Sequence, residues 1–338
     1  MILVTGGLGF IGSHTVVALQ EKGHNVLIVD DLSNSSIEVL DGIEAASGIR
    51  PAFTELNLQD ATALASLFEK HTITGIIHFA AFKAVGESVQ KPVAYYQNNL
   101  GSLLNLLAEV EKAETPIPFI FSSSCTVYGE AEELPITENA PVQPAISPYG
   151  NTKQIGEEIL LDTVNAIPNF RVIALRYFNP IGAHSSIAIG ELPLGKPQNL
   201  VPFITQTAAG LYPKLTVFGN DYPTTDGTNV RDYIHVVDLA EAHVVALERI
   251  LEGKSKHAYE VFNLGTGKGS SVLEVIQSFE RVSGEKLPYE IGARREGDVV
   301  AAYADTTKAN NVLGWKTQRS LDEAVASAWA WEKKIRNL

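Results

Sequence analysis

The sequence of 338 residues predicts an α/β fold: a doubly wound parallel sheet followed by a smaller C-terminal α/β lobe. The first observation behind this prediction is a glycine-rich turn between the first apolar run and the first helical pattern. The second is the alternation of short apolar runs with amphipathic segments, which is typical of a parallel sheet with helices on both faces. The third is a change after Phe178 to sequence rich in glycine and proline, which indicates a separate lobe.

The N-terminal segment has the pattern of a strand, a turn and a helix. Ile2–Val4 is a short apolar strand, and TGGLGFIGSH leads directly from it into a helical pattern that ends near Gly23. Gly6, Gly9 and Gly12 allow a tight turn and a close backbone approach, so that a pyrophosphate can bind at the helix N-terminus. This is the arrangement of a Rossmann-type dinucleotide-binding domain.

A second strand, residues 25–29, ends in Asp30. A carboxylate at this place can accept hydrogen bonds from an adenosine ribose. It would also repel a ribose 2′-phosphate, and the residues that follow, Asp31, Leu32 and Ser33, supply no arginine or lysine to offset that repulsion. The sequence therefore favours NAD over NADP.

The remaining elements continue the alternation. We expect strands at 52–56, from Gly75, at 119–121 and at 171–176, and helices at 60–70, at 93–112 and from Tyr149 onward. Residues 1–178 are predicted to form the NAD-binding domain, and roughly 230–260 to return to it, with 230–235 in the main sheet. Residues 179–229 and 261–338 are assigned to the lobe, including an apolar strand at 261–264.

The stretch SPYGNTK at 147–153 holds the main candidates for proton transfer. Tyr149 and Lys153 are four residues apart, so a helix that starts here places both on one face. A lysine cation beside a phenol lowers the phenol pKa from about 10 towards the range useful for a base. Taken alone, the pair also fits an ordinary capped helix. The strand at 119–121, however, delivers a serine-rich run to its carboxyl end, where ligands bind in α/β sheets.

Composition limits the other function classes. The net charge of −13 argues against a nucleic acid or an anionic membrane as partner, because both need a basic surface. The single cysteine, Cys125, excludes an internal disulfide, and no basic leader or long apolar segment is found. We therefore expect a cytoplasmic protein, and the sequence assigns no metal ligands.

Several motifs occur in order along the chain: TGGLGFIG at 5–12, HFAAFKAVGES at 78–88, FSSSCTVYG at 121–129, SPYGNTK at 147–153, RYFNPIGAH at 176–184, FGNDYPTTDGTNVRDYIHV at 218–236 and RREGD at 294–298. With these motifs the chain resembles the extended short-chain dehydrogenase/reductase family over nearly its whole length. The last three lie in the lobe or at its border. They are similar to those of family members that epimerise UDP-hexoses at C4.

The resemblance implies a role for each matching residue. Tyr149 would be the base, Lys153 its electrostatic partner and an anchor for the nicotinamide ribose, and Ser124 a hydrogen-bonding relay to the sugar. The implied NAD contacts, besides these three, are Gly6, Gly9, Phe10, Ile11, Gly12, Asp30, Asp31, Leu32, Ser33, Asn34, Ser35, Asn57, Leu58, Phe79, Ala80, Ala81, Lys83, Asn98 and Phe178. The implied substrate contacts, besides Ser124 and Tyr149, are Asn179, Asn199, Leu200, Thr216, Val217, Phe218, Arg231, Arg295, Asp298 and Ala302.

One position departs from the family pattern. Where the family commonly has an aspartate facing the adenine amino group, this chain has Asn57. Its amide oxygen can still accept that hydrogen bond, but it carries no charge. The resemblance therefore implies a weaker adenine contact and the same cofactor class.

The implied reaction is oxidation of the sugar C4 hydroxyl, rotation of the 4-keto sugar and return of the hydrogen to its other face. A sugar-nucleotide 4,6-dehydratase begins with the same oxidation, but its elimination step needs a carboxylic acid/base pair directly after Ser124, where this chain has Cys125 and Thr126. A catalytically silent NAD-sensing protein is the other alternative. Such proteins lose the tyrosine or the lysine, and both are present here.

Two finer expectations also come from the resemblance. In the family, the fourth residue after the aspartate of the REGD motif lies beside the sugar C2 substituent, and a tyrosine there restricts the enzyme to plain hexoses. Ala302 occupies that place here, so we expect UDP-N-acetylhexosamines to be substrates as well. Related enzymes also dimerise through the two helices at 93–112 and from Tyr149, and we expect a homodimer.

Overall fold

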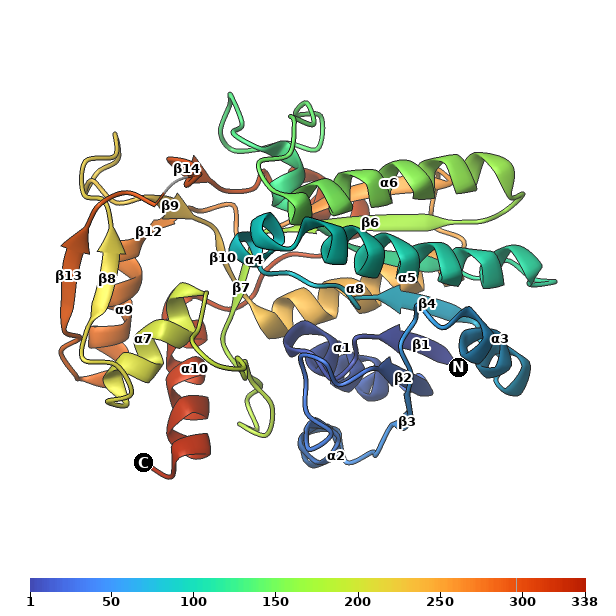
Figure 1. The fold of residues 1–338 in the computed structure, drawn as a ribbon, viewed down its shortest axis with the longest axis horizontal. Coiled ribbons are helices and arrows are strands. Elements are labelled where there is room, and N and C mark those ends of the chain that lie inside the picture. The colour runs from blue at the N-terminus through green and yellow to red at the C-terminus, as the bar shows by residue number, and fades with distance from the viewer. Residues whose placement is uncertain (296) are drawn as a thin grey trace.

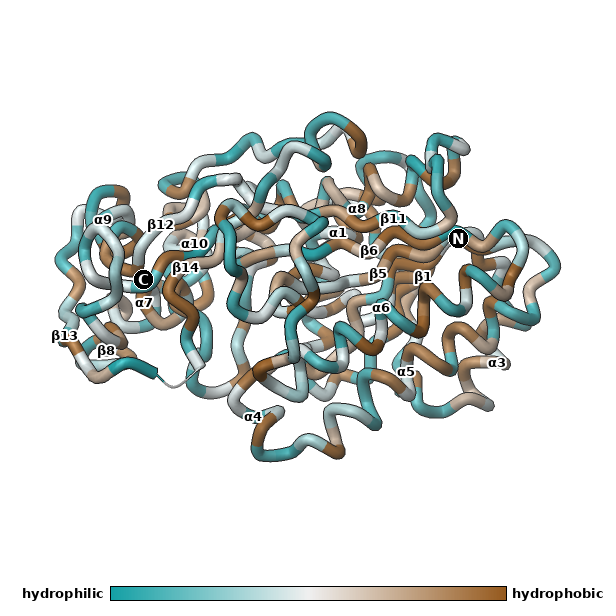
Figure 2. Tube along the Cα trace, turned by 90° about the horizontal axis from the view of Figure 1, so that it is seen from above, coloured by the Kyte–Doolittle hydropathy of each residue, from teal (hydrophilic) through white to brown (hydrophobic). Residues whose placement is uncertain are grey.

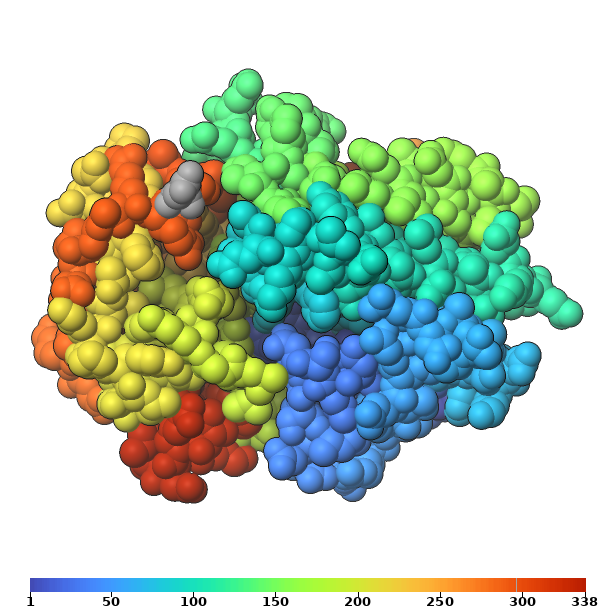
Figure 3. Space-filling model, in the orientation of Figure 1, coloured from blue at the N-terminus to red at the C-terminus, as the bar shows by residue number. Residues whose placement is uncertain are grey.

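The computed structural model describes residues 1–295 and 297–338, so Glu296 of the RREGD motif lies outside the described residues. Figure 1 shows a large α/β domain that contains the N-terminus and a smaller lobe built around α7, α9 and α10. In the space-filling view, the surface is hollowed between this lobe and the region of α4 (Figure 3).

The main sheet has seven parallel strands in the order β11-β6-β5-β4-β1-β2-β3. Their bounds are β1 Ile2–Thr5, β2 Val26–Asp30, β3 Ala52–Glu55, β4 Gly75–His78, β5 Phe119–Ser124, β6 Val172–Tyr177 and β11 Tyr259–Leu264. The order reverses between β1 and β4, and ligands of open α/β sheets bind at such a point. The doubly wound fold predicted from the sequence is confirmed.

Each face of this sheet is covered by its own helices. Side chains alternate between faces along a strand, so Ile2 and Val4 join the core beneath one layer while Leu3 joins the other. The first layer holds α1 (Phe10–Glu21), α2 (Val39–Ser47) and α8 (Val236–Leu251), and the second holds α3 (Ala61–Lys70), α5 (Pro92–Lys112) and α6 (Pro148–Ala166). Figure 2 shows the hydrophobic colour concentrated along β1, β5 and β6, the interior of the sheet.

The lobe is built from short strands and three longer helices. The strands are β7 (Asn179–Ile181), β8 (Leu215–Phe218), β9 (Val230–Arg231), β10 (Tyr233–His235), β12 (Ser270–Ser271), β13 (Tyr289–Gly292) and β14 (Ala301–Ala302). The helices are α7 (Leu200–Ala208), α9 (Val272–Ser283) and α10 (Leu321–Arg336). Ile204, Phe279 and Trp329 centre a separate apolar core between them. Two further short helices, α4 (Val85–Gln90) and η1 (Cys125–Tyr128), follow β4 and β5.

Two strand predictions were wrong. Residues 230–235 do not join the main sheet: β9 pairs with β12 and β14, and β10 pairs with β7. Residues 261–264, which we assigned to the lobe, belong to β11, which pairs with β6 and follows the crossover helix α8. Phe262 and Leu264 are fully buried there, and a short apolar run does not by itself specify which sheet will bury it. The division into two domains at the residues given above stays a prediction.

Within residues 1–295 and 297–338, no helix combines the length and the apolar character needed to cross a membrane.

Candidate active site

The glycine turn between β1 and α1 has no room for side chains. Gly6 has a φ of +68°, and a Cβ atom on it would lie 2.7 Å from the backbone nitrogen of Ala80. A Cβ atom on Gly12 would overlap the carbonyl oxygen of Gly6. Glycine at these positions lets α1 start close against the end of β1, so its N-terminal N–H groups are available to an anionic group. The turn therefore fits a pyrophosphate.

Asp30 closes the side of this turn at the end of β2. Its carboxylate accepts hydrogen bonds from the backbone N–H of Leu8 at 3.0 Å, the N–H of Leu32 at 3.1 Å and the hydroxyl of Ser35 at 2.7 Å. These donors fix the carboxylate beside the glycine turn, where an adenosine ribose would lie, as the sequence predicts. The site thus has the shape and the charge expected for NAD.

Asn57 lies next to this region and is already engaged. Its amide nitrogen donates to Asp31 at 3.3 Å, and its amide oxygen accepts the N–H of Gln59 at 2.9 Å. An amide oxygen has two acceptor positions, so one remains for an adenine amino group. The expectation of a weakened but possible adenine contact is consistent with this geometry.

Ser124, Tyr149 and Lys153 come from two neighbouring elements. Ser124 is the last residue of β5, and its hydroxyl oxygen accepts from the N–H of Thr126 at 3.2 Å. Ser147 caps the N-terminus of α6 by accepting the N–H of Gly150 at 3.1 Å, which places Tyr149 in the first helical turn. The Lys153 Nζ lies 5.9 Å from the centroid of the Tyr149 ring. The spacing argument for one helical face is confirmed.

Burial affects the protonation of both members of this pair. Burial raises the pKa of Tyr149 to about 12, and the hydroxyl of Ser124 only partly offsets that effect. Burial also lowers the pKa of Lys153 to about 8. The ammonium donates to the backbone oxygen of Ser122 at 2.6 Å, so it is directed at the strand and not at the phenol oxygen. Burial is thus the largest effect on the Tyr149 pKa, and the proposed lowering of this pKa by Lys153 stays a prediction.

On the lobe side, a cluster of charged residues surrounds β9. Asp298 accepts from Arg295 at 2.7 Å, and its carboxylate lies 3.7 Å from the Arg231 guanidinium. The Arg295 guanidinium also lies 5.7 Å from the centroid of the Phe218 ring. The structure therefore brings together four residues that the resemblance assigned to the substrate. Two arginines against one carboxylate leave a net positive charge, which suits a diphosphate.

Ala302 lies in register with Arg231 across the β14–β9 pair. Its side chain packs against a small apolar cluster that includes Val127 and Phe178. Cys125 joins the same cluster and lies within the electrostatic influence of Arg231. The wall residue of the predicted sugar site is thus next to the end of β5 that carries Ser124.

Asn199 and Leu200 begin α7, with Asn199 as its N-cap residue. The Asn199 amide donates to Glu191 at 2.7 Å, and Glu191 lies within the electrostatic influence of Lys83. Asn179 begins β7, and its backbone N–H donates to the Asp232 oxygen at 2.9 Å. Glu191 therefore contacts one predicted substrate residue, Asn199, and no motif of the sequence pointed to it.

The sequence analysis also missed a buried ion pair behind Lys153. Glu157, four residues after Lys153 on α6, pairs with Arg176 of β6. The four-residue spacing between Lys153 and Glu157 was the available signal. The partner, Arg176, lies on another element and could not be identified from the sequence.

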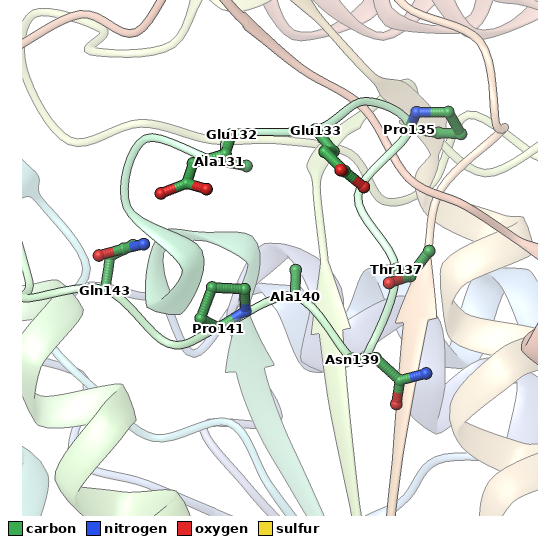
Figure 4. Close-up of a pocket in the computed structure, with 9 residues that line it drawn as sticks. All are labelled: Ala131, Glu132, Glu133, Pro135, Thr137, Asn139, Ala140, Pro141 and Gln143. Atoms are coloured by element: carbon green, nitrogen blue, oxygen red, sulfur yellow. The ribbon is translucent and has the colours of Figure 1, made fainter.

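A surface hollow lies in a different region. It has a volume of about 330 Å³ and is lined by residues of one loop, between Ala131 and Gln143 (Figure 4). Two of the lining side chains are the acidic Glu132 and Glu133. None of the predicted site residues lines this hollow. Over the described part of the chain, no group of three or more His, Cys, Asp or Glu residues could hold a metal ion.

Comparisons with known proteins agree with this geometry. The family model described as GDP-mannose 4,6 dehydratase matches residues 3–328. The UDP-glucose 4-epimerase of Bacillus subtilis (strain 168) is 50% identical over 336 residues, which are 99% of this chain and 98% of that protein.

Solved structures give the same result. The UDP-glucose-4-epimerase from Stenotrophomonas maltophila, with bound NAD and formylated UDP-arabinopyranose, has a TM-score of 0.96 and 44% identity, covering 99% of this chain and 98% of that one. The UDP-Glc/GlcNAc 4-epimerase from Campylobacter jejuni has a TM-score of 0.84 and 37% identity, covering 98% of this chain and 99% of that one.

The parallel sheet, its glycine turn and the Tyr–Lys pair on α6 define a Rossmann-fold protein of the extended short-chain dehydrogenase/reductase class. The arginine cluster of the lobe and the full-length similarity narrow this class. The chain belongs to the UDP-glucose 4-epimerase family.

Proposed function

We propose that the protein is an NAD-dependent isomerase that epimerises UDP-hexoses at C4, converting UDP-galactose to UDP-glucose through a transient 4-keto sugar. The observation that carries this proposal is the placement of Ser124 and Tyr149 at the carboxyl end of the sheet, next to the lobe wall at Ala302 and the arginines beyond it. This arrangement supports a reaction in which the acid/base groups act on the sugar and the cationic groups bind the diphosphate.

Each residue has a separate task in this reaction. Bound NAD supplies the oxidation and re-reduction of the sugar C4 carbon. Tyr149 would accept the proton of the C4 hydroxyl as the phenolate and later return it, with Ser124 hydrogen-bonded to the sugar oxygen. The positive charges of Lys153 and of the NAD⁺ nicotinamide would lower the raised pKa of the phenol for this step. Arg231 and Arg295 hold the diphosphate. The strong binding is thus on the part of the substrate that does not react, and the sugar is left able to turn between the two half-reactions.

The dehydratase alternative lacks the groups that it needs. Elimination of water requires a carboxylic acid/base pair directly after Ser124. This chain has Cys125 and Thr126 at these two positions. Burial raises the pKa of Cys125 to about 12, so its thiol stays protonated at neutral pH and cannot serve as the base. A silent NAD-sensing protein would not need the positioned tyrosine, lysine and arginines.

The proposal includes UDP-N-acetylhexosamines as substrates. The methyl group of Ala302 leaves the predicted C2 wall small, and the similar protein from Campylobacter jejuni is named for both UDP-Glc and GlcNAc. We also propose the cytoplasm as compartment, since the one cysteine is unpaired and the acidic chain needs no oxidising environment.

We further propose a homodimer in which α5 and α6 pair with their symmetry mates. These helices pack against each other and carry apolar side chains that one chain leaves exposed: Val93 is 66%, Leu104 50% and Leu161 44% exposed. In Figure 1 they lie side by side on the outer face of the large domain. Burying this stripe against a second copy would remove it from water.

Light scattering at micromolar concentration tests the homodimer. We expect twice the chain mass for the wild type, and a monomer for Leu104→Glu, which places a charge in the centre of the stripe. Val312→Glu, a substitution of a similarly exposed residue outside these helices, serves as control and should stay dimeric. A wild-type protein of monomer mass would contradict the proposal.

The proposed activity is tested with the gel-filtered protein. We expect cofactor absorbance to persist after filtration, and UDP-galactose added alone to be converted to UDP-glucose. Bound NAD without any conversion would instead support the silent NAD-sensing alternative.

A further inference from the structure

Behind the Tyr149–Lys153 pair lies a closed network of buried polar groups. The carboxylate of Glu157 accepts from Arg176 Nε at 2.8 Å and from Arg176 Nη2 at 2.5 Å. It also accepts from the hydroxyl of Ser123 at 2.5 Å. The side chains of Arg176 and Glu157 are only 7% and 10% exposed. Burying such an ion pair costs desolvation free energy, so its buried position calls for a functional explanation.

The network is held from all sides. The remaining Arg176 nitrogen, Nη1, donates to the Tyr128 hydroxyl at 3.0 Å, and that hydroxyl donates to the Asn263 side chain at 2.7 Å. Strands β5, β6 and β11 and helix η1 therefore all fix the place of the Glu157 carboxylate. The Glu157 carboxylate therefore has a fixed position and orientation.

The nearest cation on the same helix is Lys153. Residues four apart on a helix lie on neighbouring turns of one face, so Glu157 follows Lys153 along the line that starts at Tyr149. The Lys153 side chain is buried, and its ammonium donates to the neutral backbone oxygen of Ser122. A buried ammonium beside a neutral acceptor needs a counter-charge to stay protonated.

We propose that Glu157 is a positioning residue that supplies the counter-charge for the Lys153 ammonium, and that Arg176 and Ser123 hold its carboxylate in place for this task. The inference rests on the proposed function, in which Lys153 must remain a cation beside Tyr149 and the nicotinamide ribose.

The other groups around Lys153 do not take this role. His78 of β4 faces it, but burial lowers the pKa of His78 to about 3, so the imidazole is neutral. Tyr149 on α6 and Tyr177 on β6 are phenols whose pKa burial raises, so neither carries the permanent negative charge that a counter-ion needs. Tyr259 of β11 faces Glu157, and burial raises its pKa as well. Arg176 is a cation and cannot be a counter-charge.

The electrostatics agree with the geometry. Burial lowers the pKa of Lys153 to about 8, and the Glu157 carboxylate acts in the opposite direction. The charged lysine is therefore present below that pKa and lost as the pH rises through it. Removing Glu157 would lower the pKa further, so the cation would be lost at a lower pH.

The test replaces the whole ion pair, because removing one partner alone leaves an uncompensated buried charge and endangers folding. In Glu157→Met/Arg176→Met the pair becomes apolar. In Glu157→Gln/Arg176→Met the site is neutral but keeps an acceptor for Ser123. The matched control is Arg249→Met/Glu260→Met, which removes a second buried ion pair, 9% and 5% exposed, between α8 and β11.

Two readouts are compared with the NAD-loaded wild type. The alkaline limb of the pH profile for kcat on UDP-galactose should move to lower pH by about one unit or more in both Glu157 variants, the scale for losing a close opposite charge. The fraction of NAD retained on gel filtration should fall below the wild-type level between pH 7 and pH 8, where only the wild-type lysine is still largely charged, and should approach the wild-type level as the pH is lowered. The control should change neither.

Each outcome decides the matter. An unmoved alkaline limb and unchanged NAD retention in a folded Glu157 variant would overturn the proposal. So would an equal shift in the control, because it would show a general effect of losing stability. If the wild type does not isomerise UDP-galactose, the proposed function fails instead. The pH dependence of NAD retention would then still report whether Glu157 supports Lys153.

Discussion

Tyr149→Phe is expected to lower kcat for UDP-galactose by at least about a hundredfold, the scale for losing a general base. The phenol oxygen is the proposed proton acceptor, and phenylalanine keeps the ring that packs at the start of α6. The fold and the bound NAD should therefore be retained. Steady-state kinetics, cofactor absorbance and thermal unfolding of the purified variant check these three expectations.

The control for this experiment is Tyr95→Phe. The Tyr95 hydroxyl is also hydrogen-bonded, donating to Glu87 at 3.0 Å and accepting from the N–H of Ala84 at 3.1 Å, but it belongs to the start of α5 and has no proposed part in the reaction. We expect its kcat to remain near that of the wild type. A Tyr149→Phe enzyme with near-normal kcat would remove Tyr149 from the role of base.

Ala302→Tyr is expected to lower activity on UDP-N-acetylhexosamines selectively while leaving the plain hexoses as substrates. Ala302 pairs in register with Arg231 and packs on the cluster around Phe178. A tyrosine ring there would occupy the space beside the sugar C2 substituent. An acetamido group must fit in both orientations of the sugar, and overlap with a fixed ring costs about 1–3 kcal/mol, which is roughly fivefold to 150-fold in rate.

The comparison of kcat/KM for acetylated and plain substrates decides this prediction. Ala301→Tyr is the matched control, because consecutive strand residues point to opposite faces and the same ring then lies on the other side of β14. Equal losses on both classes of substrate in Ala302→Tyr would show that this residue does not select between them.

Local signals allowed much of the fold to be predicted from the sequence. The turn at Gly6 and Gly12 lies between β1 and α1 as expected, and Asp30 lies beside it, because the glycine spacing and the strand lengths leave few other arrangements. The helix around Tyr149 was predictable from other local signals. These are a serine cap, a proline in the first turn and a regular apolar pattern.

Features that depend on distant partners could not be predicted. The placement of β11 in the main sheet depends on the crossover helix α8, and not on its own short apolar run. The raised pKa of Tyr149 depends on burial in the folded chain, which no spacing rule reports. The pairing of Glu157 with Arg176 joins two elements that only the folded chain brings together. The roles assigned to individual site residues stay predictions.

The most direct test of the account uses UDP-galactose that carries deuterium at C4, incubated with the gel-filtered protein and no added cofactor. The account predicts UDP-glucose that retains the deuterium at C4, with no net oxidation or reduction of the bound NAD, because the same atom is removed from one face and returned to the other. UDP-glucose that has exchanged this deuterium for a solvent proton, or no UDP-glucose at all, would contradict it.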